Sequence, residues 1–108
     1  MSDDQRAHKA RLLRRVRRVV VKIGSNVLAG TSGLRRERIR GLAGDLATVI
    51  GAGRQVVVVS SGAVAAGAPR LGERRNRIEW RQAAAAVGQL WLMAAYERAF
   101  AAHERHVA

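Results

Sequence analysis

Two short segments of the chain carry side chains that could hold a phosphate or a carboxylate. The first is Lys22-Ile23-Gly24-Ser25, and Lys22 is one of only two lysines in a chain whose other basic residues are arginines. A compact ammonium suits a phosphate oxygen as a point charge. Gly24 lets the backbone approach an anion closely, and the N–H groups beside it can form a nest. This segment therefore predicts a phosphate site; the competing interpretation is a lysine that only reaches solvent from a strand end.

The second segment, Ser60-Ser61-Gly62, lies where a run of valines gives way to a helical pattern. Free N–H groups and the helix dipole favour an anion at such a helix start. Ser61 offers its hydroxyl to a ligand, and Gly62 leaves room for one. The competing interpretation is that Ser61 is an ordinary N-cap serine.

The residues around these segments predict a strand–helix–strand unit. Residues 19–23 are a β-branched run, typical of a parallel strand buried on both faces. Residues 55–59, with four consecutive valines, predict a second strand. Between them, apolar residues recur with a helical period, and Gly51 and Gly53 end the helix. Because a helix connects them, the two strands should be parallel and the crossover right-handed. If the strands are neighbours, both segments open on one edge, where ligands bind in open α/β sheets.

Two further helices are expected after the second strand. A short helix starts at Gly62 and ends by Gly67 and Pro69, and Asn76 with Glu79 has capping-box spacing for a long helix to about residue 103. The apolar side of the long helix is expected to contain Ile78, Val87, Leu90, Trp91, Ala94 and Ala95. Two strands cannot bury the apolar faces of these helices, so we expect the front part of a larger α/β domain.

Composition and charge exclude some classes of function but do not identify a single one. The chain has 20 basic and 8 acidic residues, for a net charge of +12, and no cysteine, which excludes disulfides, zinc–thiolate sites and cysteine nucleophiles. No apolar run approaches the ~18 residues that a membrane-spanning helix needs. The excess charge lies mostly in the first 40 residues, and residues 1–15 are expected to be an exposed basic extension. Such a charge allows binding to nucleic acid, acidic membrane surfaces or anionic metabolites.

Three segments in order resemble the amino-acid kinase family, and within it the members that phosphorylate glutamate. They are VVVKIGSNVL at 19–28, VVVVSSGAVAAG at 56–67 and RQAAAAVGQLWLMAAYERAF at 81–100. The resemblance implies an α/β fold in which the chain is the front part of a three-layer α/β/α sandwich with a mainly parallel sheet. Residues 16–108 would then be the N-terminal portion of a kinase domain that continues beyond them.

The resemblance also implies an activity, which is transfer of a phosphoryl group from ATP, with its Mg²⁺, to the γ-carboxylate of L-glutamate. Lys22 would be the catalytic lysine and would bind the ATP phosphates together with Gly24 and Ser25. Ser61 and Gly62 would bind glutamate, and no metal is expected on the protein itself. L-Glutamate and ATP are the expected partners. The full-length enzyme is expected to be a cytoplasmic homo-oligomer that does not bind a membrane, and no binding of nucleic acid is expected for this part.

The same resemblance places further glutamate ligands, the nucleotide-base site and a second phosphate-contacting lysine later in the family's chains. We therefore expect the 108 residues by themselves to be inactive. Two alternatives of the same class are another amino-acid kinase and the kinase half of a bifunctional proline-pathway enzyme. An alternative of a different class is a basic module that binds nucleic acid or another anion, and the net charge of +12 favours it.

Overall fold

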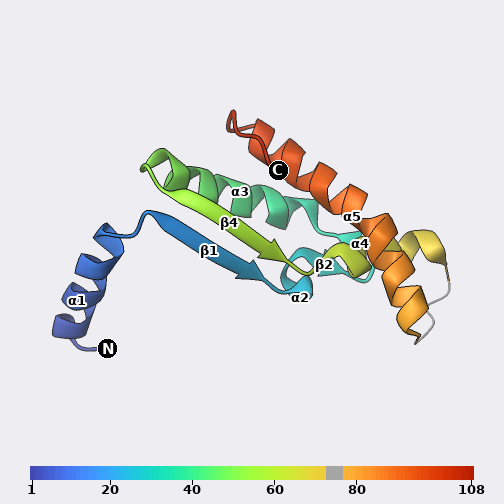
Figure 1. Cartoon of the computed structure of the whole chain (residues 1–108), viewed down its shortest axis with the longest axis horizontal. Helices are drawn as coiled ribbons and strands as arrows, with labels where there is room; N and C mark the ends of the chain where they lie inside the picture. Colours follow the sequence, from blue (N-terminus) through green and yellow to red (C-terminus); the bar gives the residue numbers. More distant parts are fainter. Residues whose placement is uncertain (73–76) are drawn as a thin grey trace.

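A computed structural model describes residues 1–72 and 77–108 of the chain. Two parallel strands lie at the centre, and helices α3 and α5 run along them (Figure 1). The cap expected at Asn76 lies outside the described residues. No helix among those described is both long enough and apolar enough to cross a membrane.

The central sheet is formed by two strands far apart in the sequence. Strand β1 (Arg18–Ile23) pairs in parallel with β4 (Gln55–Ser60), with Lys22 in register with Val59. Helix α3 (Arg36–Gly51) lies between them in the sequence and supplies the crossover. The predicted strand–helix–strand unit and the α/β class are confirmed.

Helix α3 follows directly from its apolar spacing. Ile39, Ala43 and Leu46 are its buried residues, and they recur at intervals of four and three along one face. The helix ends at Gly51, as predicted, and Gly53 then takes a φ of +87°, which favours glycine. The chain can therefore reverse and enter β4.

One face of the sheet packs on the helices and forms the core. The inward valines Val21, Val56 and Val58 pack against this cluster. The buried residues of the cluster are Ile23, Leu28, Ile39, Ala43, Leu46, Leu92, Tyr96, Ala99 and Phe100. The core thus joins β1 and β4 to α3 and α5, and α5 contributes its two aromatic side chains, Tyr96 and Phe100.

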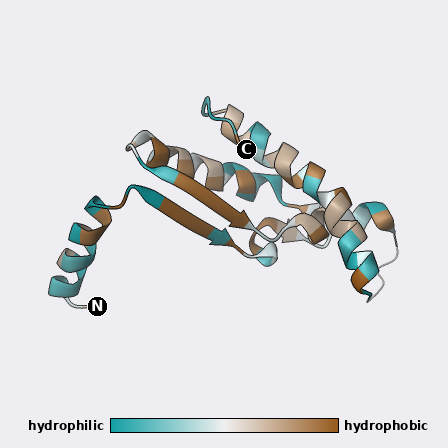
Figure 2. Ribbon diagram, in the orientation of Figure 1, coloured by the Kyte–Doolittle hydropathy of each residue, from teal (hydrophilic) through white to brown (hydrophobic). Residues whose placement is uncertain are grey.

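The other face of the sheet is open within the described residues. Val20, Val57 and Val59 are 64%, 45% and 48% exposed, and Figure 2 shows the two strands as largely hydrophobic. The expectation that the first strand is buried on both faces is therefore wrong for this chain. The reason is that α3 and α5 cover the same side, so the described residues form two layers and not three.

A small hairpin connects β1 to α3. It follows the single turn α2 (Ser25–Leu28) and consists of β2 (Ala29–Gly30) paired antiparallel with β3 (Gly33–Leu34). Gly33 has a φ of +110°, which only glycine adopts easily, and it lets the chain turn between the two short strands. The two strands themselves were not predicted, because two residues are too few to produce an alternating pattern.

Helices α4 (Ala63–Leu71) and α5 (Ile78–Ala101) cross at very close range. A Cβ atom built on Gly67 would overlap the carbonyl group of Ala84 and lie 2.7 Å from the Gly88 nitrogen. Helix α4 was predicted to end by Gly67 to Pro69, but it continues to Leu71, and Gly67 makes the contact with α5. Pro69 is accommodated near the end of α4, where it removes a single helical hydrogen bond.

The predicted apolar side of α5 is wrong in part: Ala95 packs against the core, but three of the large residues do not. Ile78 and Leu90 are 71% and 69% exposed, and Trp91 is partly exposed. The face that is buried carries Ala84, Gly88, Leu92, Tyr96, Ala99 and Phe100. Small residues on this face allow the backbone of α4 to approach, and hydropathy gives them little weight in a sequence pattern.

The basic extension is a helix that projects from the start of β1 (Figure 1). Helix α1 (Asp3–Arg14) begins with a capping box in which Ser2 and Gln5 satisfy each other's backbone N–H groups. None of its residues is buried. The Arg54 guanidinium donates a hydrogen bond of 3.1 Å to the Leu13 carbonyl near the end of the helix. This bond and its neighbours hold α1 to the loop before β4.

Candidate active site at the strand ends

The carboxyl ends of β1 and β4 meet at one edge of the sheet. Ile23 is in register with Ser60, and the Ser61 N–H donates to the Ile23 carbonyl at 3.3 Å. The Ser61 hydroxyl donates to the same carbonyl at 3.4 Å. The segment that holds Lys22 therefore lies directly against the segment that holds Ser61, as expected for parallel neighbours.

Lys22 lies on the open face of the sheet. Its side chain is exposed and shares this face with Val20 and Val57, because alternate residues of a strand point to opposite sides. Within the described residues it has no hydrogen bond and no ion pair. The ammonium is thus solvated and available to an anion, whereas the sequence indicated a lysine inside a doubly buried strand. Exposure fits the solvated interpretation as well as the phosphate site.

The backbone beside Lys22 leaves open space. Gly24 is the residue before α2 and has an ordinary φ of −70°, so its conformation does not require glycine. A Cβ built on it would meet no atom within 4 Å. Ser25, the first residue of α2, is half-buried. The gap at Gly24 is therefore a place where a ligand could approach the main chain.

The second segment differs from its prediction in two details. Helix α4 starts after Gly62 without any side-chain cap, so the interpretation of Ser61 as an N-cap serine is wrong. Its hydroxyl bonds back to Ile23 instead. Gly62 is buried, and a Cβ there would meet Leu92 at 3.5 Å and Leu34 at 3.8 Å. Its missing side chain therefore faces the core and adds no room on the ligand side, while exposed Ser61 remains accessible.

Sequence reasoning missed a pair of hydroxyl groups beneath this edge. The Ser60 hydroxyl and the Tyr96 hydroxyl are both buried, and in the described part of the chain neither reaches hydrogen-bonding geometry with a partner. Burial raises the pKa of Tyr96, and the nearby Ser60 hydroxyl offsets part of that rise. A tyrosine 36 positions away gives no local signal that it will lie behind the strand end.

Known proteins resemble the part of the chain that forms this site. The sequence model described as the amino acid kinase family matches residues 17–108. A glutamate 5-kinase of Citrifermentans bemidjiense is 53% identical over 100 residues, covering 90% of this chain and 27% of that protein. Glutamate 5-kinases of Aromatoleum aromaticum and Myxococcus xanthus are 48% and 52% identical over 99 residues. Each of these alignments covers 89% of this chain.

The chain spans about a quarter of the length of the curated relatives it matches, 27%, 27% and 26% for the three named above. The matched residues include both parallel strands, the crossover helix and the two segments that meet at the sheet edge. From the parallel strand pair, its loops and the family match together, it follows that the chain belongs to the amino acid kinase family.

Proposed function

We propose that this chain is the first part of a kinase that transfers a phosphoryl group from ATP to the γ-carboxylate of L-glutamate. The product would be L-glutamyl 5-phosphate, made in the cytoplasm for proline biosynthesis. The observation that carries the proposal is the contact between Ser61 and the Ile23 carbonyl. This contact holds the loop after β1 against the loop after β4. Relatives that are about half identical are named glutamate 5-kinase, and this supports glutamate as the acceptor.

In the proposed reaction, a γ-carboxylate oxygen of glutamate attacks the terminal phosphorus of ATP. A new phosphorus–oxygen bond forms to the carboxylate, the bond to the ADP oxygen breaks, and ADP leaves with the electron pair. A carboxylate is already ionised at neutral pH, so this step needs no general base. Catalysis can therefore rest on positioning and on neutralising negative charge.

Lys22 is the residue proposed to neutralise that charge. Its ammonium is exposed at the strand end and would contact the phosphate oxygens as a point charge. The open space at Gly24 would let the phosphates approach the backbone, with Ser25 next to them. Mg²⁺ would arrive with the nucleotide as part of the substrate, so this part of the chain needs to supply no metal ligand.

Ser61 is proposed to hold glutamate on the neighbouring loop. Its hydroxyl makes only a long hydrogen bond of 3.4 Å to Ile23, so it can exchange that bond for one to a substrate. Gly62 would contribute only its backbone to the ligand, because the position of a side chain there points at Leu92 and Leu34 in the core. Acceptor and donor would then meet between positions 61 and 22.

We further propose that residues 16–108 form the amino-terminal portion of the kinase domain, with residues 1–15 as a basic extension. The relatives are almost four times as long as the matched segment. Their remaining length would supply the other glutamate ligands, the base site and a second lysine, as the family resemblance implies. The 108 residues by themselves should then give no turnover in an ATP- and glutamate-dependent hydroxamate assay. Sustained turnover would contradict this division of the site.

The decisive experiment replaces Lys22 in the full-length protein that carries this chain. We expect Lys22→Ala to lower kcat by about 100-fold or more, the magnitude typical of a lost transition-state contact. Lys9→Ala is the matched control, because Lys9 is the only other lysine and lies on exposed α1. Near-normal turnover of Lys22→Ala would refute the phosphate assignment. Aspartate and N-acetylglutamate tested as acceptors separate this proposal from another amino-acid kinase.

A further inference from the structure

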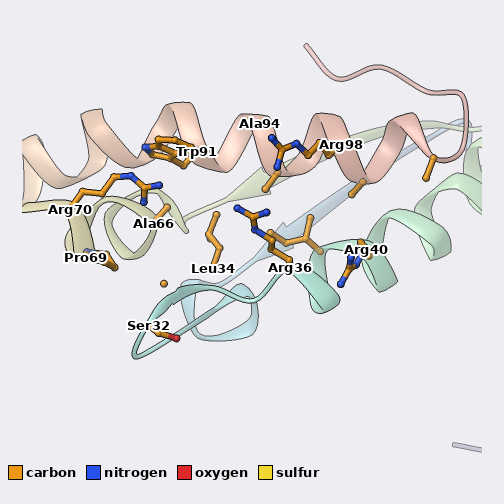
Figure 3. Close-up of a pocket in the computed structure, with 15 residues that line it drawn as sticks. Ser32, Leu34, Arg36, Arg40, Ala66, Pro69, Arg70, Trp91, Ala94 and Arg98 are labelled. Atoms are coloured by element: carbon orange, nitrogen blue, oxygen red, sulfur yellow. The ribbon is translucent and has the colours of Figure 1, made fainter.

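A pocket of about 410 Å³ lies where α3, α4, α5 and the β2–β3 hairpin meet (Figure 3). We call it the arginine pocket, because four of the arginines that the structure describes line it: Arg36, Arg40, Arg70 and Arg98. None of the residues assigned to the candidate active site lines it. Its volume lies within the range of about 300–1,000 Å³ typical of small-molecule sites.

The charge of the arginine pocket has a single sign. Among residues 1–72 and 77–108, no aspartate or glutamate lines the pocket, and no carboxylate forms an ion pair with any of its four arginines. In Figure 3, Arg36 reaches from α3 toward α5, and the Arg98 side chain runs along α5 above it, so both guanidinium groups border the same space. Two guanidinium groups that border one space without a counter-charge repel each other, and an anion between them removes that repulsion.

The chemistry of the side chains indicates which anion. An arginine guanidinium presents a planar fork of N–H donors that matches the oxygen pairs of a phosphate. Two such forks on opposite walls can hold a dianionic head group from both sides. Glutamine or serine side chains would be expected instead for a neutral ligand, and in the part of the chain that the structure describes the pocket has only Ser32 of that kind.

The rest of the pocket is apolar and suits the body of an organic molecule. Its lining includes Leu34, Ala66, Ala95 and Ala99, with the Trp91 ring at one end. The Arg70 guanidinium stacks 3.7 Å from the centre of the Trp91 ring. This stacking orders the tryptophan and places a third cation beside the apolar wall. A ligand with both a charged head and a hydrophobic body therefore fits better than a free inorganic ion.

We propose that the arginine pocket binds a small organic phosphate, with the phosphate between Arg36 and Arg98 and the apolar body against the alanines near Trp91. This site is separate from the strand-end site and does not depend on the kinase assignment. It adds an anion-binding function to a face of the chain that the proposed reaction does not use.

The first test compares three probes on the whole 108-residue chain by isothermal titration calorimetry. Phenyl phosphate carries head and body, inorganic phosphate only the head, and phenol only the body. We expect phenyl phosphate to bind saturably with one site, at least about tenfold more tightly than phosphate, since both parts of the pocket contribute. Phenol should bind too weakly to measure. Equal affinities for phenyl phosphate and phosphate, or no saturation, would overturn the proposal.

The second test removes the charges of Arg36 and Arg98. Arg36→Gln with Arg98→Gln should weaken phenyl phosphate binding at least about tenfold, since each loses a charge-assisted hydrogen bond. The matched control is Arg38→Gln with Arg81→Gln, which removes the same charge from the same two helices at exposed positions outside the pocket. Equal weakening in both double variants would show a net-charge effect only and would overturn the site.

A third variant distinguishes the two anion sites of this chain. Lys22→Ala should leave the affinity for phenyl phosphate unchanged. If this variant no longer binds phenyl phosphate, the bound phosphate lies at the strand ends and the proposal is overturned. Circular dichroism checks that each variant is folded. If the arginine variants do not fold, the probe series on the unchanged chain still decides the proposal.

Discussion

Gly67 on α4 and Gly88 on α5 lie against each other where the two helices cross. A Cβ on Gly67 would overlap the Ala84 carbonyl, and a Cβ on Gly88 would overlap the Ala63 carbonyl and lie 2.8 Å from its carbon. These neighbours are backbone atoms, which cannot move aside as a flexible side chain can. The crossing brings the start of α4, and with it the Ser61 loop, close to the core face of α5.

Adding a single methyl group at this crossing should damage the fold. We expect Gly88→Ala to destabilise the protein by about 3 kcal/mol or more, because overpacking against backbone forces the helices apart. Gly41→Ala is the control: Gly41 is helical, and a Cβ there meets nothing within 4 Å. That change should stabilise by about 0.5–1 kcal/mol through helix propensity. Thermal unfolding followed by circular dichroism measures both, and similar melting temperatures would contradict the close crossing.

Ser61→Ala in the full-length protein should chiefly raise the KM for glutamate, by about tenfold, since one hydrogen bond to the substrate is lost. The Ser61 N–H still bonds to the Ile23 carbonyl, so the loop should keep its position. Thr31→Val, which removes an exposed hydroxyl from the hairpin turn, is the control. Steady-state kinetics with varied glutamate and ATP decide the case. A lower kcat with unchanged KM for glutamate would contradict a role in substrate binding.

The open valine face should make the chain self-associate in isolation. Replacing Val20 and Val57 by threonine keeps the β-branched shape but adds hydroxyls on the exposed side, so self-association should fall while the fold remains. The same replacement at Val21 and Val58, which face the core and are partly buried, should destabilise the chain, because an unpaired hydroxyl inside the core costs up to about 1–3 kcal/mol. Sedimentation velocity over a concentration series measures association. If the variant with threonine at positions 20 and 57 self-associates as much as the unchanged chain, the open valine face is not the surface through which the copies associate.

The segment after α5 should respond to acid through Glu97. Hydrogen bonds from His106 and from the Val107 N–H hold the pKa of the Glu97 carboxyl below its ordinary value of 4.5. A lowered pKa means that this contact contributes stability above pH 4.5 and loses it as the pH falls through the lower folded value. The Val107 amide resonance should therefore shift and exchange faster in that acidic range. In Glu97→Gln the transition should vanish, and a transition that persists would assign it to another group.

The sequence predicted the regular elements that local patterns control. The valine runs gave β1 and β4, the spacing of Ile39, Ala43 and Leu46 gave α3, and the parallel pairing followed from the crossover. It failed on the faces of α5, where Ile78 and Leu90 are exposed and Gly88 is buried. Hydropathy depends on the side chain, so it does not identify a glycine that is buried because another backbone approaches it closely.

For the candidate site, the residue types at positions 22, 24 and 61 could be chosen from the chain alone, because charge, backbone freedom and hydroxyl chemistry belong to single residues. Their meeting at one edge, the return of the Ser61 hydroxyl to Ile23 and the burial of Tyr96 behind Ser60 could not. Neither could the placement of Arg36 and Arg98, which are 62 positions apart, at one pocket. Such contacts depend on how helices and strands pack across long sequence distances, and only the tertiary structure decides that.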